Sequence, residues 1–516
     1  MHLAFAPDIG NIPEWMNGNY FMNGPGKFET GDFKVNHLFD GYAMIVKFDI
    51  KSDAVKFQSR FIQSDAFKKF TNHGKPVFQE FGTPGAADPD RNAFGRFVSK
   101  FVPLELTDNV CANFQVIGNE LYASSETNFL WLINQDTLET IEKVDISKIL
   151  GTNVCCSHPH ITPDGTIYNA GSSFGAVMKY NVFKVDPPDN TDKNSNSDSK
   201  SLERKGYRKG EVLFTISSKW STCYGYYHSF GMTENYFILI EQCLTANIPK
   251  LVVSQMKGKA IKDCLEWIPN ENTRFILMDR RKGNVSKVKY LAEPFFVLHH
   301  INAFEEGDDI VVDLVAYNTA QILDNLFLDK LKKSDFDLCE GPQIRRYVLP
   351  VNVEKVEPST TNLIKFECDA TAVLKKQKQV WLEPSLICKP GFDIPRINYE
   401  EYNSRKYKFV YGCCEMGPNV FNHSIIKVNM ETKSEEVWVG PSENKFLEPI
   451  FVKNPNGDAE DDGLLLFLGI SLKENTNHLL MILDAKQMKE VARVDIPSTI
   501  FLPFAFHGCY IPRNRN

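Results

Sequence analysis

The chain has 516 residues, of which 43% are hydrophobic and 24% charged, and its 58 basic and 65 acidic side chains give a formal net charge of −7. A chain of this length can bury a large core, and its slight acidity argues against a nucleic-acid surface while allowing a neutral or apolar ligand. The sequence contains no run of about 18 apolar residues, so we expect no membrane-spanning helix.

The cysteines and the N-terminus indicate a reducing compartment. The 12 cysteines are scattered, with Cys155-Cys156 and Cys413-Cys414 adjacent and no Cys-x-x-Cys motif. The first residues also lack the basic, then apolar, then small-residue order of a secretory signal. We therefore expect a cytoplasmic protein. The 38 phenylalanines can line an apolar tunnel as well as fill a core.

Short strands separated by turns dominate the chain. They are rich in Val, Ile, Leu, Phe and Tyr, and many are bounded by Gly, Asn, Asp or Pro. Because they are spread evenly and few helical patterns lie between them, they predict an all-β propeller of four-stranded blades rather than a parallel α/β sheet. The strands that we expect are 43–49, 114–124, 166–170, 236–242, 309–316, 407–412, 424–429, 463–470 and 479–484.

Three segments depart from this pattern. Residues 319–333 place apolar side chains at helical spacing with lysines near the end, which predicts a helix that covers one face of the fold. Residues 189–209 are polar and of low complexity, and we expect a mobile surface loop there. Residues 91–106 combine phenylalanines at helical spacing with Arg91, Arg96 and Lys100. They predict either a buried amphipathic helix, which is slightly favoured, or a segment in contact with a membrane surface.

Histidines in apolar, aromatic contexts are candidates for a metal site. His158 and His160 begin an extended run and would share one face of a strand, so either of them could point to a common centre. Further histidines lie far downstream, at His228, at the pair His299-His300 and at His507. Any one of them is explained more simply as a structural or surface residue. Their joint occurrence in similar strand contexts indicates a metal centre.

Carboxylates could complete such a centre. Four neutral imidazoles that converge where the inner strands of a propeller meet would hold a divalent transition metal, and iron(II) with open coordination positions would bind O2. Metal-bound imidazoles need an acceptor on the other ring nitrogen. Glu126, Asp393 and Glu448 stand alone in apolar contexts and could supply it. Each is weak evidence by itself, because acidic residues beside Pro or Thr are commonly turn or cap residues.

The chain resembles the carotenoid cleavage oxygenases, which include the metazoan β-carotene oxygenases, the insect isomerooxygenases and the retinal pigment epithelium isomerohydrolase. The resemblance runs nearly from end to end. The motifs that carry it are Asn23-Gly24-Pro25-Gly26-Lys27-Phe28-Glu29, His37-Leu38-Phe39-Asp40-Gly41, Ser125-Glu126-Thr127-Asn128-Phe129, His158-Pro159-His160, His228-Ser229-Phe230-Gly231, Glu448-Pro449-Ile450-Phe451, Glu460-Asp461-Asp462-Gly463 and Phe506-His507-Gly508.

This resemblance implies a single domain over residues 1–516, a seven-bladed β-propeller with Fe(II) on its axis under a helical cap that encloses an apolar tunnel. It also implies which residues form the site. The implied iron ligands are His158, His228, His299 and His507, with His160 and His300 as neighbours that do not bind the metal. The carboxylates that would accept hydrogen bonds from the ligands are Glu126, Asp393 and Glu448.

Four positions depart from the family pattern and suggest a divergent branch. Asp393 stands where relatives carry Glu, so its shorter side chain must approach its histidine more closely or act through water. Ala112 stands where Val or Thr usually crowds the open side of the iron. Residues 87–91 lack the cysteine that relatives use for lipid attachment. Met22 stands where an Arg commonly precedes the Asn-Gly-Pro-Gly motif.

The implied activity is that of an iron(II) dioxygenase that inserts O2 across one double bond of a carotenoid, with no side chain acting as acid or base. We expect cleavage at the central 15,15′ bond to give retinal. The alternatives within the family are eccentric 9′,10′ cleavage, cleavage combined with isomerisation, and hydrolysis with isomerisation of a retinyl ester. A non-enzymatic carotenoid or retinoid carrier and a propeller used only for protein interaction are the alternatives outside enzymology.

Overall fold

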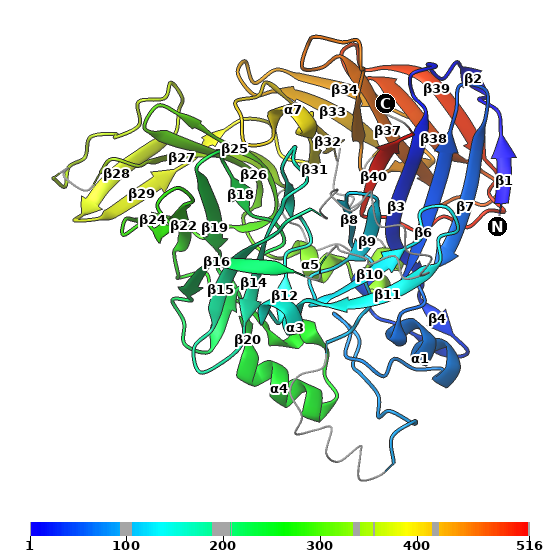
Figure 1. The fold of residues 1–516 in the computed structure, drawn as a ribbon, viewed down its shortest axis with the longest axis horizontal. Helices are drawn as coiled ribbons and strands as arrows, with labels where there is room; N and C mark the ends of the chain where they lie inside the picture. Colours follow the sequence, from blue (N-terminus) through cyan, green and yellow to red (C-terminus); the bar gives the residue numbers. More distant parts are fainter. Residues whose placement is uncertain are drawn as a thin grey trace, which may run out of the picture.

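Sheets arranged around a common centre make up the protein (Figure 1), and their strands pair antiparallel except for β24 (Lys289–Ala292) with β29 (Gln379–Glu383) among the described residues. The computed structural model describes residues 2–92, 106–187, 207, 209–333, 341–353, 357–414 and 423–513. Among these residues, seven sheets contain four or more strands. The all-β, seven-bladed propeller is therefore confirmed, although the strands alone had not set the number of blades.

The blades follow one another along the chain, except that β28 (Thr371–Lys376) and β29 return to the third blade after the fourth has begun and β2 (Ile9–Gly10) joins the sixth. The first is built from β8 (Asn113–Ile117), β9 (Glu120–Ser124), β10 (Phe129–Ile133) and β11 (Thr140–Asp145). The second contains β12 (Val154–Cys155), β13 (His160–Ile161), β14 (Ile167–Ser173), β15 (Lys179–Val185) and β16 (Gly210–Ser217). The third contains β18 (Gly231–Met232), β19 (Tyr236–Glu241), β22 (Thr273–Asp279), β23 (Asn284–Val285), β24 (Lys289–Ala292), β28 (Thr371–Lys376) and β29 (Gln379–Glu383).

The remaining blades complete the ring. The fourth is built from β25 (Phe296–Glu306), β26 (Asp309–Tyr317), β27 (Gln343–Pro350) and β30 (Ser385–Leu386). The fifth contains β31 (Phe392–Arg396), β32 (Phe409–Cys414), β33 (Ser424–Asn429) and β34 (Glu435–Val439). The sixth contains β2 (Ile9–Gly10), β35 (Asn444–Phe446), β36 (Ile450–Lys453), β37 (Gly463–Ser471), β38 (His478–Asp484) and β39 (Lys489–Ile496).

The seventh blade combines strands from both ends of the chain. It contains β1 (His2–Phe5), β3 (Gly18–Lys27), β6 (Tyr42–Ile50), β7 (Val55–Phe61) and β40 (His507–Pro512). β3 pairs with β40 in antiparallel register from Gly18 opposite Pro512 to Asn23 opposite His507. Figure 1 shows the blue β3 beside the red β40. This pairing closes the ring and brings His507 to the axis.

Smaller sheets and short helices lie outside the seven blades. The sheets are β4 (Glu29–Thr30) with β5 (Phe33–Lys34), and β17 (Cys223–Gly225) with β20 (Leu244–Asn247) and β21 (Leu265–Trp267). The helices are η1 (Leu38–Asp40), α1 (Asp65–His73), α3 (Ile146–Leu150), α4 (Ile248–Lys257), η3 (Ile261–Cys264), α5 (Ile322–Asn325), α6 (Leu328–Lys333) and α7 (Tyr399–Tyr402).

The cores lie between neighbouring blades. One cluster packs Tyr20 and Phe48 of the seventh blade against Leu466, Leu468 and Leu480 of the sixth. All five of these side chains are buried. Faces of adjacent sheets therefore exclude water from each other all round the ring, which holds the inner strands in place.

The expected strands agree with the structure apart from details of their ends and one division. The segment 114–124 forms two strands, β8 and β9, because Gly118 adopts a left-handed conformation with φ of 56° and starts a two-residue turn. The segment expected at 407–412 instead begins at Phe409 and runs to Cys414.

The helix predicted over 319–333 is divided into α5 and α6. The backbone between them pairs with the segment around η1: Leu38 N donates to the carbonyl of Leu326, and Leu328 N donates to the carbonyl of Asn36. His37 and Phe327 form an isolated bridge between these hydrogen bonds. These contacts take up backbone groups that a continuous helix would have used internally. The result is a cap fastened to the propeller.

Two expected segments lie outside the described residues for most of their length. These are the mobile loop at 189–209, of which Tyr207 and Lys209 alone are described, and the amphipathic segment at 91–106, of which residues 93–105 are not. No helix in the described part of the chain has both the length and the apolar character needed to cross a membrane. The eleven cysteines in the described ranges are all free.

Candidate metal centre

Four histidines from four blades meet on the axis. His158 lies between β12 and β13, His228 precedes β18, His299 lies on β25, and His507 is the first residue of β40. One nitrogen of each ring lies within 4.8 Å of one nitrogen of every other. The expectation that His158 and His160 share one strand was wrong, because β13 begins only at His160 and Pro159 offers no backbone N–H for a ladder.

The facing nitrogens fit a metal cation. His158 Nε2 lies 2.8 Å from His228 Nε2 and 3.2 Å from His507 Nε2. His299 Nε2 is buried and has no hydrogen-bond partner. The opposite nitrogens of three rings face carboxylates and must carry the proton there, so their Nε2 atoms present lone pairs to each other. Such a cluster of acceptors is repulsive by itself and becomes favourable around a transition-metal ion.

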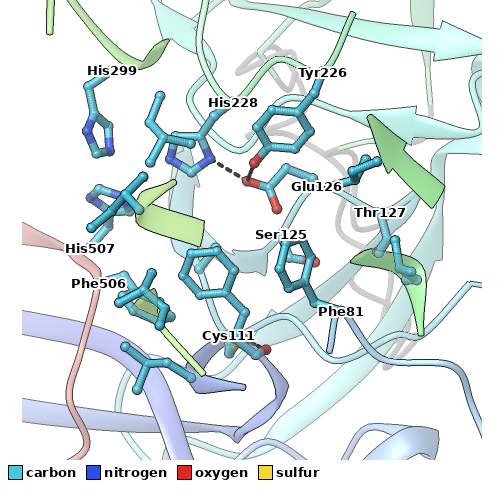
Figure 2. A pocket seen from close by; sticks show the side chains of 18 of the residues that line it. Phe81, Cys111, Ser125, Glu126, Thr127, Tyr226, His228, His299, Phe506 and His507 are labelled. Atoms are coloured by element: carbon cyan, nitrogen blue, oxygen red, sulfur yellow. Dashed lines mark hydrogen bonds and ion pairs between the residues drawn. The ribbon is translucent and has the colours of Figure 1, made fainter. Parts of the chain in front are cut away.

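Each predicted carboxylate lies against its own ligand histidine. His228 Nδ1 donates to Glu126, and the Tyr226 hydroxyl donates to the same carboxylate at 3.3 Å (Figure 2). His299 Nδ1 donates to Asp393 Oδ1 at 2.7 Å. The aspartate therefore reaches its histidine directly, without a water molecule between them.

The third carboxylate, Glu448, is held most firmly. It accepts from His507 Nδ1 at 2.8 Å, from Arg396 Nε at 2.8 Å and from Gly508 N at 2.8 Å. Burial alone would raise the pKa of Glu448, but Arg396 and His507 lower this pKa to about 2. The carboxylate is therefore ionised and fixes the tautomer of His507.

His158 is the histidine of the cluster that no carboxylate contacts among the described residues. Its Nδ1 lies 3.4 Å from the side-chain amide of Asn113, which also donates to the carbonyl of Ser157 at 2.8 Å. Burial, followed by the neighbouring histidines His507, His228 and His299, holds the pKa of His158 well below its usual value. The ring is therefore neutral, as a metal ligand must be.

His160 and His300 face away from the cluster. His160 Nε2 donates to the carbonyl of Phe230 at 2.9 Å, and the hydroxyl of Tyr399 donates to its Nδ1 at 3.1 Å. His300 Nδ1 donates to Ser229 Oγ at 2.8 Å. Burial lowers the pKa to about 4 for His160 and to about 3 for His300. Both rings are thus neutral structural groups that support the connections beside the ligands.

An apolar cavity of about 490 Å³ opens onto the histidines. Rings of Phe39, Phe81, Phe174, Phe446, Phe504 and Phe506 line it, together with Tyr226 and Tyr317. His228, His299 and His507 form part of its wall, and Figure 2 shows their rings gathered on one side of it. η1, α4, η3 and α5 each contribute lining residues, which confirms the helical cap. Ala112 also lies in the wall.

Sequence reasoning missed several residues of the site. Asn113, Tyr226, Tyr317 and Arg396 hold the ligands or their carboxylates. Arg396 lies within the Asp393 motif, and Tyr226 lies two residues before His228. This closeness in sequence to predicted site residues is the signal that could have identified Arg396 and Tyr226. Nothing local marks Tyr317, because its contact with Asp393 joins residues 76 positions apart.

Known proteins resemble this chain over nearly its whole length. The family described as retinal pigment epithelial membrane protein matches residues 3–512. A mitochondrial carotenoid-cleaving dioxygenase from Mustela putorius furo is 36% identical over 518 residues, which cover 97% of this chain and 92% of the relative. A beta,beta-carotene 15,15′-dioxygenase from Gallus gallus is 35% identical over 514 residues, which cover 98% of this chain and 95% of the relative.

Solved structures show the same fold. A cobalt-substituted Synechocystis apocarotenoid oxygenase superposes with a TM-score of 0.77 at 22% identity, over 99% of this chain and 96% of that one. A chimera of that enzyme with the retinal pigment epithelial protein gives a TM-score of 0.76 at 22% identity, with the same coverage. At this level of identity the likeness concerns the fold.

Proposed function

The chain belongs to the retinal pigment epithelial membrane protein family of carotenoid oxygenases, and from this premise we propose that it is an iron(II) dioxygenase that cleaves a carotenoid into apocarotenoid aldehydes. The observation that carries the proposal is the meeting of four imidazoles, of which His228, His299 and His507 are backed by carboxylates and line a largely apolar cavity. The names of the relatives, which include carotenoid-cleaving enzymes, support the same substrate class.

The residues divide the work between metal binding and substrate binding. His158, His228, His299 and His507 would hold iron(II) through their Nε2 atoms, and Glu126, Asp393 and Glu448 keep the protons of three of these rings on Nδ1. Bound iron(II) supplies the binding and activation of O2. Four protein ligands leave coordination positions for it.

The cavity wall orients the polyene and keeps out water. Phenylalanine rings offer flat apolar surface to a conjugated chain. A third carboxyl group in the wall, Glu80, accepts from the Thr107 hydroxyl at 2.9 Å, while Glu126 and Asp393 already accept hydrogen bonds from histidines. None of them is needed to move a proton, because cleavage of a double bond by O2 into two carbonyls conserves every hydrogen of the substrate. The small side chain of Ala112 leaves room beside the centre.

Central cleavage at the 15,15′ bond is the specific reaction that we propose, as in the name of the Gallus gallus relative. Incubating the iron-loaded protein with β-carotene and O2, followed by chromatography, tests it. Retinal as the sole product supports central cleavage. An apocarotenal with an ionone would replace it with the eccentric reaction. Stoichiometric binding of unchanged pigment without O2 uptake would instead indicate a carrier.

We also propose peripheral contact with an intracellular membrane, from which an apolar substrate could enter. The apolar and basic pattern of residues 91–106 supports this contact. So does α4, on which Leu251 lines the cavity while Val252, Val253 and Met256 are 42%, 45% and 43% exposed. The sequence favoured the cytoplasm, whereas several relatives are named mitochondrial. Cell fractionation with compartment markers distinguishes these locations.

The chain over residues 1–516 is proposed to act as one domain. The pairing of β3 with β40 supports this organisation, because strands from the two ends of the chain share one blade. Limited proteolysis tests it: a single cooperative loss of the intact protein is expected, and a stable fragment that retains part of the ring would contradict it.

A further inference from the structure

The carboxylate beside His299 is anchored differently from the other two. Asp393 Oδ1 accepts from His299 Nδ1 at 2.7 Å and from the backbone N–H of Ile394 at 2.7 Å. The hydroxyl of Tyr317 donates to the other oxygen, Oδ2. A side chain one methylene shorter than glutamate is thus held at both oxygens, one by the backbone next to it and one by a tyrosine.

The backbone after Asp393 is strained. Ile394 has φ of 55°, a left-handed conformation that a β-branched residue rarely adopts, and Pro395 follows it. The pairing of β31 with β32 shifts register between Asp393 and Arg396. Such strain persists only where surrounding contacts hold it in place. The turn directs the Ile394 N–H back to Asp393 Oδ1 and so presents the short carboxylate to His299.

Tyr317 is built into the same unit as the ligand. It is the last residue of β26 and lies opposite Phe296 on β25, the strand that carries His299. Its side chain is buried, and it also lines the cavity. The ligand and the tyrosine therefore move together as parts of one β-hairpin, while Asp393 comes from the next blade.

We propose that Tyr317 is a positioning residue of the metal centre, and that Tyr317 and Asp393 act as one unit in place of the glutamate found in relatives. The inference rests on the proposed function in that the four histidines bind a metal. Without the hydroxyl, Asp393 Oδ2 would lose its donor in the wall of the cavity and the carboxylate could turn away from His299. The tautomer and orientation of His299 would then be less well fixed, and metal binding would weaken.

Metal retention tests the proposal directly. Protein loaded with iron(II) or cobalt(II) is mixed with a chelator, and the rate and extent of metal loss are measured for wild type, Tyr317→Phe and Tyr399→Phe. Tyr399→Phe is the matched control, because it removes a hydroxyl that bonds His160, which is not a ligand. We expect Tyr317→Phe to weaken metal binding by about 10- to 100-fold and the control to match wild type. Equal retention in the two variants would overturn the proposal.

Rescue by a longer carboxylate separates positioning from general structure. Asp393→Glu in the wild-type background should weaken metal binding, because the added methylene crowds the Tyr317 hydroxyl and the turn at Ile394. The same change in Tyr317→Phe should recover metal binding, since the longer side chain fills the space left by the hydroxyl. Additive losses in the double variant would contradict the inference. The absorption spectrum of the cobalt(II) proteins should differ from that of wild type in each single variant and should return toward it in the double variant.

The design allows for poor folding and for failure of the proposed activity. Thermal unfolding of the metal-free proteins shows whether each variant folds. If Tyr317→Phe does not fold, a Tyr317→Phe/Asp393→Glu protein that folds and retains metal still supports the unit, whereas one that also fails to fold assigns Tyr317 a structural role and overturns the proposal. Metal retention needs no carotenoid, so a wild-type protein that binds iron and cleaves no pigment would refute the proposed activity alone.

Discussion

At the scale of single residues, each of the four histidines on the axis lies beside its own partner. His228 donates to Glu126, whose carboxylate also takes the hydroxyl of Tyr226. Burial would raise the pKa of Glu126, but His228 and the hydrogen bonds lower it. The carboxylate therefore accepts the Nδ1 hydrogen of His228 and fixes the orientation of the ring. Another side chain at position 228 would lack both this hydrogen bond and the Nε2 atom that faces the other histidines.

Replacing His228 should therefore remove the metal. We expect His228→Ala to retain less than one hundredth of the iron of wild type under dialysis, because losing a ligand costs more than the roughly 10- to 100-fold loss caused by changes to a ligand's partner. Iron content by elemental analysis measures the effect. His423→Ala, at a histidine that lies beside Lys445 outside the centre, is the control and should retain iron fully. Full activity in iron-loaded His228→Ala would contradict the assignment.

The sequence could name the four histidines that meet on the axis, and the three carboxylates beside them, because these residues lie in short motifs. His158, His228, His299 and His507 were assigned through a resemblance, whereas periodicity left His158 and His160 equivalent. The structure separates them through contacts that no local pattern contains, such as the bond from His160 to the carbonyl of Phe230. Tyr317 was missed for the same reason, since it meets Asp393 only after two blades have packed together.

At the scale of elements, the cap is fastened through η1. His37 is fully buried; its Nε2 donates to the carbonyl of Leu323 on α5 at 2.8 Å, and its Nδ1 accepts from Phe39 N at 3.1 Å. Asp40 receives the His37 N–H and the backbone N–H of Gly82. Hydrogen bonds of one neutral imidazole thus join η1 to α5 over the cavity.

The titration of His37 should make the protein less stable in acid. Burial lowers the pKa of His37 to about 4, a shift that the bond to Leu323 opposes. Because the folded pKa lies below the unfolded one, the contribution is present above pH 6.5 and is lost as the pH falls to 4. A shift of this size corresponds to a few kcal/mol, at most about 3. Lys262 and Asp324 also face the ring and act in opposite directions.

Denaturant unfolding of wild type and His37→Gln across this pH range tests the effect. The glutamine amide can still donate to Leu323 but cannot titrate. We expect the free energy of unfolding of wild type to fall more steeply below pH 6.5 than that of the variant. Asp40, whose pKa burial raises to about 6, contributes a slope of opposite sign that both proteins share. If the free energies of unfolding of the two proteins change with pH in parallel, the titration of His37 does not contribute to stability.

The exposed face of α4 gives a second prediction at this scale. Val253→Asp places a charge on the apolar face beside the cavity, so binding to anionic phospholipid vesicles should fall at least several-fold. Vesicle co-sedimentation measures the change. Val439→Asp, on β34 and at a valine that is 62% exposed, is the control and should bind as wild type does. Equal losses would indicate a general charge effect.

Prediction of elements from the sequence succeeded where a strand is bounded by its own turn residues. It failed where hydrogen bonds to a segment far away in the sequence end a helix. Residues 319–333 are the example, because their periodicity alone predicts one continuous helix. The interruption comes from Leu38 and Asn36, whose backbones bond to Leu326 and Leu328. No pattern inside the helical segment contains that information.

At the scale of the whole molecule, ring closure links the stability of the fold to the metal centre. His507 begins β40, and Asn23 on β3 lies opposite it. Asn23 also donates to the carbonyl of Val110 at 2.7 Å, just before the first blade. The strands expected from the sequence indicate blades, and the family resemblance supplied the number of blades. The joining of the two chain ends in one blade was not predicted. Closure is a non-local pairing that local propensity does not describe.

Gly508 is the position at which this closure can be tested. A Cβ added there would lie 2.3 Å from the backbone oxygen of Phe21 and 2.2 Å from Met22 Sδ. The sulfur could move, but the backbone oxygen cannot move without separating β3 from β40. We therefore expect Gly508→Ala to cost about 1–3 kcal/mol in the free energy of unfolding. Since Gly508 N also donates to Glu448, iron should be lost as well.

The matched control is Gly175→Ala, because the nearest atom to a Cβ there is 3.9 Å away. This variant should unfold at the wild-type temperature and keep its iron, whereas Gly508→Ala should show a lower unfolding temperature with metal and a smaller difference between metal-bound and metal-free protein. That smaller difference is the informative quantity, because a metal stabilises the folded state only in proportion to its binding. A lower unfolding temperature with undiminished stabilisation by iron would mean that the ring closes independently of the centre it encloses.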